Sequence, residues 1–438
     1  MPIRDKIGIN GGKHSVDQTN QGNDNPLSGI IGCYRLFNAM NYDYYTTPSD
    51  VTNTPCNSVP THNTYGVVGG ANQRDRINNL KNNGGFDVLI TQSVFVVGEG
   101  FPNRMWSAQE LGCDPFDYQT AVNNSKAYWD SWFGTYCGNM DEVSIGNEFW
   151  GDITADGLRA WIEGALVSKA ENCPNIKMCL SSFRYDDSYF GSGHDLITEL
   201  YPTANDIPQG IDCLDIHPYA FDQPGQANAQ SLNACPFKSG SDSNSNLDAL
   251  DRYNTNNLPY TVSEFGYDSQ TVGERLQAAW TLQFLVSQLA NPNFDKMFAY
   301  QDRDNVQSSS QFYDNLYNSS GWFYQSTTGG FGQAKQIVDV FEEFLNTVGD
   351  YDFNRVVEDN NDVFIISVVD QNGNECLIAF TKGSCGTPNQ TNSRFLELSD
   401  YGYNQTPSNV VSLEQRNCCW LQNEQRIVLQ DMPTIICL

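Results

Sequence analysis

The stretch from Val143 to Glu148 reads VSIGNE, an apolar run that leads directly into an amide and a carboxylate. A second stretch, from Tyr260 to Tyr267, reads YTVSEFGY and also carries a carboxylate, Glu264, at the end of an apolar run. Short apolar runs of this kind are typical of buried parallel strands. Because the end of a strand holds a side chain rigidly, both stretches indicate a strand that positions a functional glutamate.

Similar runs recur along the chain up to about residue 345, separated by longer polar or amphipathic stretches, which is the pattern of repeated βα units. The predicted strands are 7–10, 33–37, 86–91, 143–147, 177–181, 213–217, 260–264 and 296–300. The clearest helices are predicted at 273–290 and 332–346, where apolar residues recur three and four positions apart. Eight units favour an α/β fold that closes as a (β/α)₈ TIM barrel, with Glu148 following the fourth strand and Glu264 ending the seventh.

The pattern changes after about residue 350 to strand-like runs at 363–369 and 376–381, joined by turn signals such as Asn372-Gly373-Asn374. The sequence therefore predicts a barrel domain over residues 1–348 and a small C-terminal antiparallel β-sandwich over residues 349–438. We expect the sandwich to pack against the barrel as an accessory domain, with carbohydrate binding as the alternative. The oxygen-rich segment 242–246 lacks the glycine and the closing glutamate of a calcium loop and is predicted to be a solvated loop.

The amino-acid composition restricts the kinds of molecule that the protein can bind. The net charge of −28 repels nucleic acid and anionic membrane surfaces, so a neutral substrate fits better. No run approaches the roughly 20 apolar residues of a membrane helix. Thirteen cysteines without paired metal-site spacing, with only four histidines, favour disulfides over a metal centre and leave at least one thiol unpaired.

Disulfides indicate an oxidising compartment, and Asn-x-Ser/Thr sequons at Asn123, Asn318, Asn389 and Asn404 agree with export. The chain begins with Met1 and shows no apolar signal segment, so we favour the interpretation that the signal was replaced. We expect a secreted monomer.

Two carboxyl groups about 5 to 5.5 Å apart can cleave a glycosidic bond with retention, one as acid/base and the other as nucleophile. Like charges at that distance cannot both ionise cheaply, and the glutamate in the less polar setting has the higher pKa. Glu148 is followed by Phe149 and Trp150, so it is predicted to be the acid/base and Glu264 the nucleophile.

These residues resemble the clan A glycoside hydrolases, which carry Asn-Glu at the end of strand four and Glu at the end of strand seven. The Gly146-Asn147-Glu148 motif is similar to family 17, whereas the chain length and added β-domain look more like families 30 and 39. The resemblance implies that Asn147 binds the sugar 2-hydroxyl, and that Arg35, His217 and Tyr219 surround the nucleophile. From the residues alone, His217 could equally be a core histidine and Arg35 the partner of a structural carboxylate.

Clan members often place a tryptophan at the end of strand eight as a sugar platform, but this sequence reads Phe298-Ala299-Tyr300-Gln301. Tyr300 or Trp322 is expected to replace it, and Trp150 is a further stacking candidate. The leading hypothesis is a retaining β-glycosidase on a neutral polysaccharide, endo-acting on a β-glucan, without metal or organic cofactor. The alternatives are a non-catalytic carbohydrate-binding or structural barrel protein, and a transglycosylase that uses the same residues.

Overall fold

The computed structural model describes residues 1–11, 25–39, 73–93, 117–146, 155–183, 199–219, 236, 242–304, 319–326, 330–382, 393–413, 420–421 and 426–438. Among these residues, no helix is both long and apolar enough to cross a membrane.

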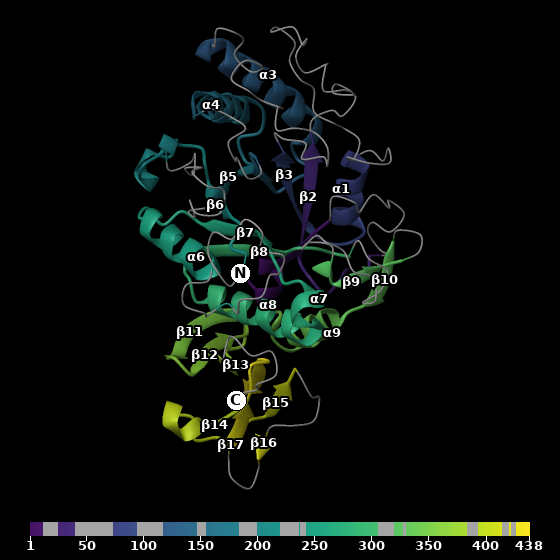
Figure 1. Ribbon diagram of the computed structural model, residues 1–438, viewed down its shortest axis with the longest axis vertical. Coiled ribbons are helices and arrows are strands. Elements are labelled where there is room, and N and C mark those ends of the chain that lie inside the picture. Colours follow the sequence, from purple (N-terminus) through teal and green to yellow (C-terminus); the bar gives the residue numbers. More distant parts are fainter. Residues whose placement is uncertain are drawn as a thin grey trace.

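Eight parallel strands form a closed barrel in the order β1 to β8, with β8 paired to β1 (Figure 1). The strands are β1 (Ile7–Asn10), β2 (Cys33–Ala39), β3 (Asp87–Ser93), β4 (Glu142–Ser144), β5 (Lys177–Phe183), β6 (Cys213–Ile216), β7 (Tyr260–Phe265) and β8 (Phe294–Ala299). Each overlaps a run predicted as a strand, so the predicted barrel is confirmed. The agreement follows from burial on both faces, which makes parallel strands apolar throughout.

Helices cover the outside of the barrel. They are α1 (Gln73–Asn82), α3 (Tyr118–Tyr136), α4 (Ala155–Asn172), α6 (Asp242–Tyr253), α7 (Ser269–Val272), α8 (Glu274–Leu289) and α9 (Gln336–Val348). In α3 the Asp117 side chain accepts a hydrogen bond from the backbone N–H of Thr120 and so caps the helix. The aromatic side chains of α3 pack on Trp161 of α4, and a disulfide between Cys137 and Cys173 joins the C-terminal ends of these two helices.

Two local predictions were wrong. The helix expected at 332–346 begins only at Gln336, because Phe331–Ala334 is a strand, β10, paired with β9 (Phe323–Gln325). A side chain at Gly332 would lie 2.7 Å from the carbonyl oxygen of Tyr324, so the hairpin depends on this glycine. The segment 242–246, predicted as a loop, is the first turn of α6, where Asp, Ser and Asn are favoured.

The chain after α9 forms two antiparallel sheets, which lie at the end of the long axis of the molecule that carries the C-terminus in Figure 1. One has the order β11 (Asp352–Asp359), β12 (Val363–Val369), β13 (Glu375–Thr381), β18 (Thr434–Cys437), β15 (Asn409–Ser412). The other has the order β14 (Arg394–Glu397), β17 (Arg426–Leu429), β16 (Trp420–Leu421). The predicted antiparallel β-sandwich is thereby confirmed, and a disulfide between Cys376 and Cys437 joins β13 to β18.

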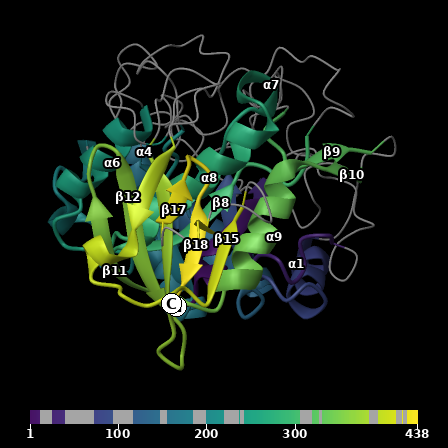
Figure 2. The ribbon, with the colours of Figure 1, turned by 90° about the horizontal axis from the view of Figure 1, so that it is seen from below.

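The central strands of the larger sheet, β12 and β13, are buried on both faces. Figure 2 shows this sheet from below. Along β12, Phe364, Ile366 and Val368 belong to the core shared with the barrel helices, whereas Ile365 packs with Leu396 and Ile427 of the smaller sheet. Side chains in a strand alternate between faces, so a strand buried on both sides reads as a continuous apolar run.

Polar contacts also join the sandwich to α8. Arg275 pairs with Asp431 at 2.6 Å, and the Gln283 side-chain amide donates to the backbone carbonyl of Asp431. The predicted boundary at residues 348 and 349 falls between α9 and β11, but the division into two folding units stays a prediction.

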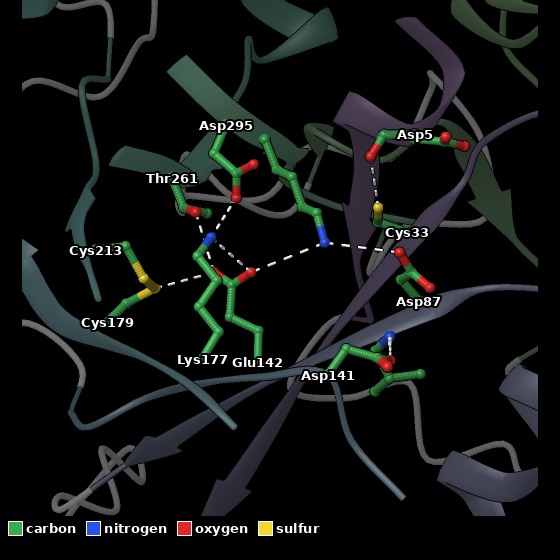
Figure 3. Close-up of polar contacts among 12 residues, drawn as sticks. Asp5, Cys33, Asp87, Asp141, Glu142, Lys177, Cys179, Cys213, Thr261 and Asp295 are labelled. Carbon is green, nitrogen blue, oxygen red and sulfur yellow. Dashed lines mark hydrogen bonds and ion pairs between the residues drawn. A yellow bond between two sulfur atoms is a disulfide. The ribbon is translucent and has the colours of Figure 1, made fainter. Parts of the chain in front are cut away.

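The N-terminal ends of the strands close the barrel with a buried polar network, shown in Figure 3. Glu142 of β4 is 1% exposed, and its carboxylate lies 3.1 Å from Nζ of Lys177 and 3.8 Å from Nζ of Lys296. The Thr261 hydroxyl donates to the same carboxylate at 3.0 Å. Burial would lower the pKa of Lys177, but Glu142 and Asp295 outweigh that effect and raise it. At this N-terminal end of the barrel, which we call the barrel floor, the negative and positive side chains therefore neutralise one another.

A disulfide between Cys179 of β5 and Cys213 of β6 lies against Glu142, and these two cysteines face each other in the strand register. Cys33 of β2 is a free, buried thiol, and its Sγ lies 3.1 Å from the carbonyl oxygen of Asp5. The predicted use of cysteines in disulfides with one thiol unpaired is confirmed within the described ranges.

The floor network generates a stability prediction. Replacing Glu142 by Gln takes a shared counter-charge from two half-buried lysines, which keep Asp295 and Asp87 as partners, so the free energy of unfolding should fall by about 1–3 kcal/mol in urea denaturation at pH 7. Adding Lys296→Met should recover part of the loss. Glu163→Gln, on the exposed side of α4, is the matched control and should change stability by less than about 0.5 kcal/mol. An unchanged urea midpoint for Glu142→Gln would show that the network contributes no stability.

Candidate active site

Glu264 lies near the carboxyl end of β7 and is 7% exposed. The carboxyl ends of parallel strands meet at one end of a barrel, so the described residues that directly follow β4, β6 and β8 lie at the same end as Glu264. His217, directly after β6, and Tyr300, directly after β8, therefore lie at the same end of the barrel as Glu264.

Two groups bind the Glu264 carboxylate directly. Nη1 of Arg35 donates to Oε1 at 2.7 Å, and the Tyr219 hydroxyl donates to Oε2 at 2.7 Å. Arg35 is fully buried and also donates to Oδ1 of Asn10 at 2.8 Å. Asn10 in turn donates to the backbone carbonyl of Ser263, the neighbour of Glu264. Four strand ends therefore fix one carboxylate.

His217 adds a third contact to the nucleophile candidate. Its Nδ1 lies 3.8 Å from Oε2 of Glu264, and its Nε2 lies 2.7 Å from the Ser263 hydroxyl oxygen. Next to it on β6, Asp215 is completely buried and accepts a hydrogen bond from the Ser144 hydroxyl at 2.6 Å.

These contacts set the ionisation of Glu264. Burial by itself would raise the pKa of its carboxyl group, but His217, Arg35 and the Tyr219 hydroxyl together outweigh burial and hold the pKa at about 2. Above that pH the carboxylate is charged and oriented. An oriented, ionised carboxylate in a nearly dry site is suited to nucleophilic attack or to stabilising a cation.

Tyr300 also lies at this site. Its ring packs edge-on against Tyr219, with centroids 6.5 Å apart. Gly266, two residues after Glu264, lets the Tyr300 backbone approach, because a side chain at Gly266 would lie 2.4 Å from the Tyr300 carbonyl oxygen. Packing against the Tyr300 backbone thus explains the glycine of the YTVSEFGY stretch.

Trp322 has different surroundings. Its side chain is 1% exposed, and its ring packs on Phe341 of α9 with centroids 4.5 Å apart. These contacts make Trp322 part of the core between the β8–α9 connection and the helix layer. Of the two aromatic residues expected to replace the strand-eight tryptophan, Tyr300 is therefore the one that the structure places beside the Glu264 cluster.

Three predicted site residues, Asn147, Glu148 and Trp150, lie outside the residues that the structure describes. The described chain reaches Gly146, just after β4, and resumes at Ala155 at the start of α4. The catalytic roles of all the predicted site residues, including Glu264, Arg35, His217 and Tyr219, stay proposals.

Sequence reasoning missed Asn10, Ser144, Asp215 and Ser263. Asn10 is the last residue of β1. Asp215 of β6 stands two positions before His217, which follows the strand, so strand alternation places the Asp215 carboxylate and the His217 imidazole on one face. That alternation was a usable signal for Asp215. The two serines carry no comparable signal, because small hydroxyl side chains are common inside strands.

One group of potential metal ligands occurs among the described residues, formed by Glu142, Cys179 and Cys213 on the barrel floor. The two sulfur atoms are bonded to each other in the disulfide, so they are not thiolate ligands.

The fold recurs in solved structures. A family 39 glycoside hydrolase from the gut symbiont Bacteroides cellulosilyticus matches with a TM-score of 0.61 at 11% identity, covering 100% of this chain and 81% of the other. The catalytic domain of family 30 xylanase C from Talaromyces cellulolyticus matches with a TM-score of 0.52 at 12% identity, covering 99% and 96%. A family 86 glycoside hydrolase in complex with neoagarooctaose matches with a TM-score of 0.54 at 11% identity, covering 99% and 75%.

No protein-family model and no curated protein sequence matches the chain. The expected resemblance to clan A glycoside hydrolases is confirmed at the level of the fold, and it includes families 30 and 39, which the chain length and added β-domain suggested.

The contacts of Glu264 generate a pH prediction. Removing the Tyr219 hydroxyl in Tyr219→Phe takes away a donor that favours the charged carboxylate, so the pKa of Glu264 should rise by about one pH unit. Glu264 has a folded pKa of about 2 against an ordinary value of 4.5. Its contribution to stability is therefore complete above pH 4.5 and is lost as the pH falls towards 2.

Unfolding free energies measured between pH 5 and 2 should thus decline less steeply for Tyr219→Phe than for the wild type. Tyr118→Phe, which removes an exposed hydroxyl bonded to Glu163, serves as the control. Parallel curves for Tyr219→Phe and wild type would contradict the prediction.

Proposed function

We propose that the protein is a retaining β-glycosidase in which Glu264 is the nucleophile and Glu148 the acid/base. The observation that carries the proposal is the pair of hydrogen bonds from Arg35 and Tyr219 to a buried carboxylate at the carboxyl end of β7. A nucleophile must be ionised and aimed before the substrate arrives, and this arrangement supplies both conditions. The shared fold with clan A glycoside hydrolases supports the same assignment.

The proposed reaction has two displacements. A carboxylate oxygen of Glu264 forms a bond to the anomeric carbon while the bond from that carbon to the leaving oxygen breaks, and Glu148 gives its proton to that oxygen. Water then attacks the anomeric carbon, Glu148 takes the proton of the water, and Glu264 leaves as a carboxylate. Asn147 would bind the sugar 2-hydroxyl, and Tyr300 and Trp150 would stack on sugar rings.

For the substrate, we propose a neutral polysaccharide outside the cell, cleaved internally, with a β-glucan as the first choice. The net charge of −28 supports a neutral substrate, and the disulfides support secretion. Two proteins that share the fold are described as a xylanase and as a complex with neoagarooctaose, which supports a carbohydrate ligand. The protein is proposed to act as a monomer.

The two glutamates predict different kinetic defects. Glu264→Gln should lower kcat by about 10⁴-fold or more on every substrate, because no covalent intermediate forms. Glu148→Gln should lower kcat/KM by about 10²–10⁴-fold on polysaccharide but far less on a dinitrophenyl glycoside, whose leaving group needs no proton, while kcat on that glycoside should still fall because water attack has lost its base. Glu163→Gln on α4 is the matched control for a lost carboxylate. Full activity of Glu264→Gln would overturn the nucleophile assignment.

The substrate class has its own test. Reducing sugar released from β-1,3-glucan, mixed-linkage β-glucan, xylan, mannan and agarose would be measured for the wild type and for Glu264→Gln. We expect release from a β-glucan, with a rapid fall in viscosity that indicates internal cleavage. Release from another glycan would correct the substrate, and oligomers longer than the starting material would indicate transglycosylation instead.

A further inference from the structure

Asp215 is a fully buried carboxylate whose two oxygens have unequal surroundings. Its Oδ2 accepts the Ser144 hydroxyl at 2.6 Å, whereas its Oδ1 has no hydrogen-bond partner among the described residues. A buried, unpaired carboxylate oxygen is costly unless a positive group lies close by. Nε2 of His217 lies 4.0 Å from this oxygen.

The imidazole ring of His217 stands between two carboxylates. Asp215 lies on its Nε2 side, and Oε2 of Glu264 lies 3.8 Å from Nδ1 on the other side. A neutral ring carries an N–H on one nitrogen and so can offer a donor towards only one of the two carboxylates, whereas an imidazolium carries an N–H on both nitrogens. The Ser263 hydroxyl, 2.7 Å from Nε2, can accept one of these N–H groups.

Two carboxylates and one other cation surround the ring. Arg35 of β2 faces Oε1 of Glu264 on β7, at 2.7 Å, and supplies one positive charge to that carboxylate. Asp215 of β6 lies on the Nε2 side of the ring, and Asp302, which follows β8, is a further buried acidic residue that accepts a hydrogen bond from the Tyr34 hydroxyl. Tyr219 and Tyr300, from the segments after β6 and β8, add neutral hydroxyl and ring contacts. A protonated His217 places a second cation beside Glu264 and between the Glu264 and Asp215 carboxylates.

We propose that Asp215 is a positioning residue that keeps His217 protonated, so that a cation faces the Glu264 carboxylate throughout the working pH range. The inference rests on the proposed role of Glu264 as nucleophile. Asp215 itself does not touch the substrate; it acts through the imidazole, and Ser144 holds its carboxylate in place.

In this arrangement, a side chain inside the barrel sets the charge beside the nucleophile. The lowered pKa of Glu264 agrees with a cation beside it, since burial alone would act in the opposite direction. A neutral His217 would remove that cation and leave Arg35 as the charged partner. The charge on Asp215 would thus decide whether the nucleophile has one cationic neighbour or two.

The direct test is the charge state of His217 in the whole protein. The chain has only four histidines, so the ring nitrogens can be followed by ¹⁵N NMR and assigned with His217→Gln. In the wild type we expect both His217 nitrogens to stay protonated through pH 7. In Asp215→Asn, which keeps the shape and the acceptor for Ser144, the ring should lose its proton at a pH lower by about one unit or more.

Two variants serve as controls. Ser144→Ala removes the hydroxyl but leaves the Asp215 charge, so His217 should stay protonated as in the wild type. Asp212→Asn removes another carboxylate, one paired with Lys169, and should leave His217 unchanged. Identical His217 titrations in Asp215→Asn and the wild type, or a His217 that is neutral at pH 7 in the wild type, would overturn the proposal.

Kinetics separate a charge effect from a packing defect. With a hydrolysed glycan, kcat of Asp215→Asn, which includes the departure of Glu264 in the second displacement, should approach the wild-type value at low pH, where His217 is protonated in both proteins, and fall by about tenfold or more as the pH rises. A loss of equal size at every pH would mean a structural role and overturn the inference. If no glycan is hydrolysed, the proposed function fails while the NMR titration still tests the charge pair.

Discussion

The ion pair between Arg35 and Glu264 is the interaction on which the rest of the site depends. Both groups are buried, and removing either one leaves an uncompensated charge inside the barrel, which is far costlier than the pair itself. Arg35 stands on β2 and Glu264 on β7, with β1 and β8 between them in the sheet. The two side chains therefore meet across the interior, and only because the sheet closes. Asn10 of β1 joins the pair by bonding Arg35 and the backbone next to Glu264, so the closing strand also aligns the site.

The interior of this barrel is unusually polar for a fold whose strands normally fill it with branched apolar side chains. Glu142 with its lysines forms the floor, Asp215 and Ser144 lie above it, and Glu264 lies at the open end. Such groups supply little net stability, because pairing only offsets their desolvation. Stability must come from elsewhere: from the aromatic packing of α3 on α4, from the apolar faces of the β12–β13 sheet, and from disulfides such as Cys179–Cys213. The layers outside the barrel thus supply most of the stability, whereas the side chains inside the barrel form the candidate site.

The barrel could be predicted from sequence because its strands are buried on both faces and stand out as short apolar runs. Glu264 could be singled out because it ends such a run, whereas Arg35 and Tyr219 were identified only through the resemblance to clan A glycoside hydrolases. Asn10 was missed, since whether a strand residue points inwards depends on how the closed sheet is tilted and staggered, which no local pattern reports. Asp215 was missed although its position two residues before His217 was a usable signal. The start of α9 was misplaced for a similar reason, because the close approach of Gly332 to Tyr324 is a tertiary contact. Trp322 was chosen for its residue type, yet its packing on Phe341 follows from the helix layer.

A nucleophile held at a pKa of about 2 has a chemical consequence on the proposed mechanism. Cations and hydrogen bonds that stabilise a carboxylate weaken it as a nucleophile and improve it as a leaving group. Formation of the glycosyl-enzyme would then rely on proton donation to the leaving oxygen, while its hydrolysis would benefit from the ease with which Glu264 departs. Arg35, Tyr219 and His217 therefore favour the second displacement. They also make the first displacement depend more strongly on proton donation by Glu148. The same contacts that orient Glu264 for attack make the reaction dependent on a well-placed Glu148.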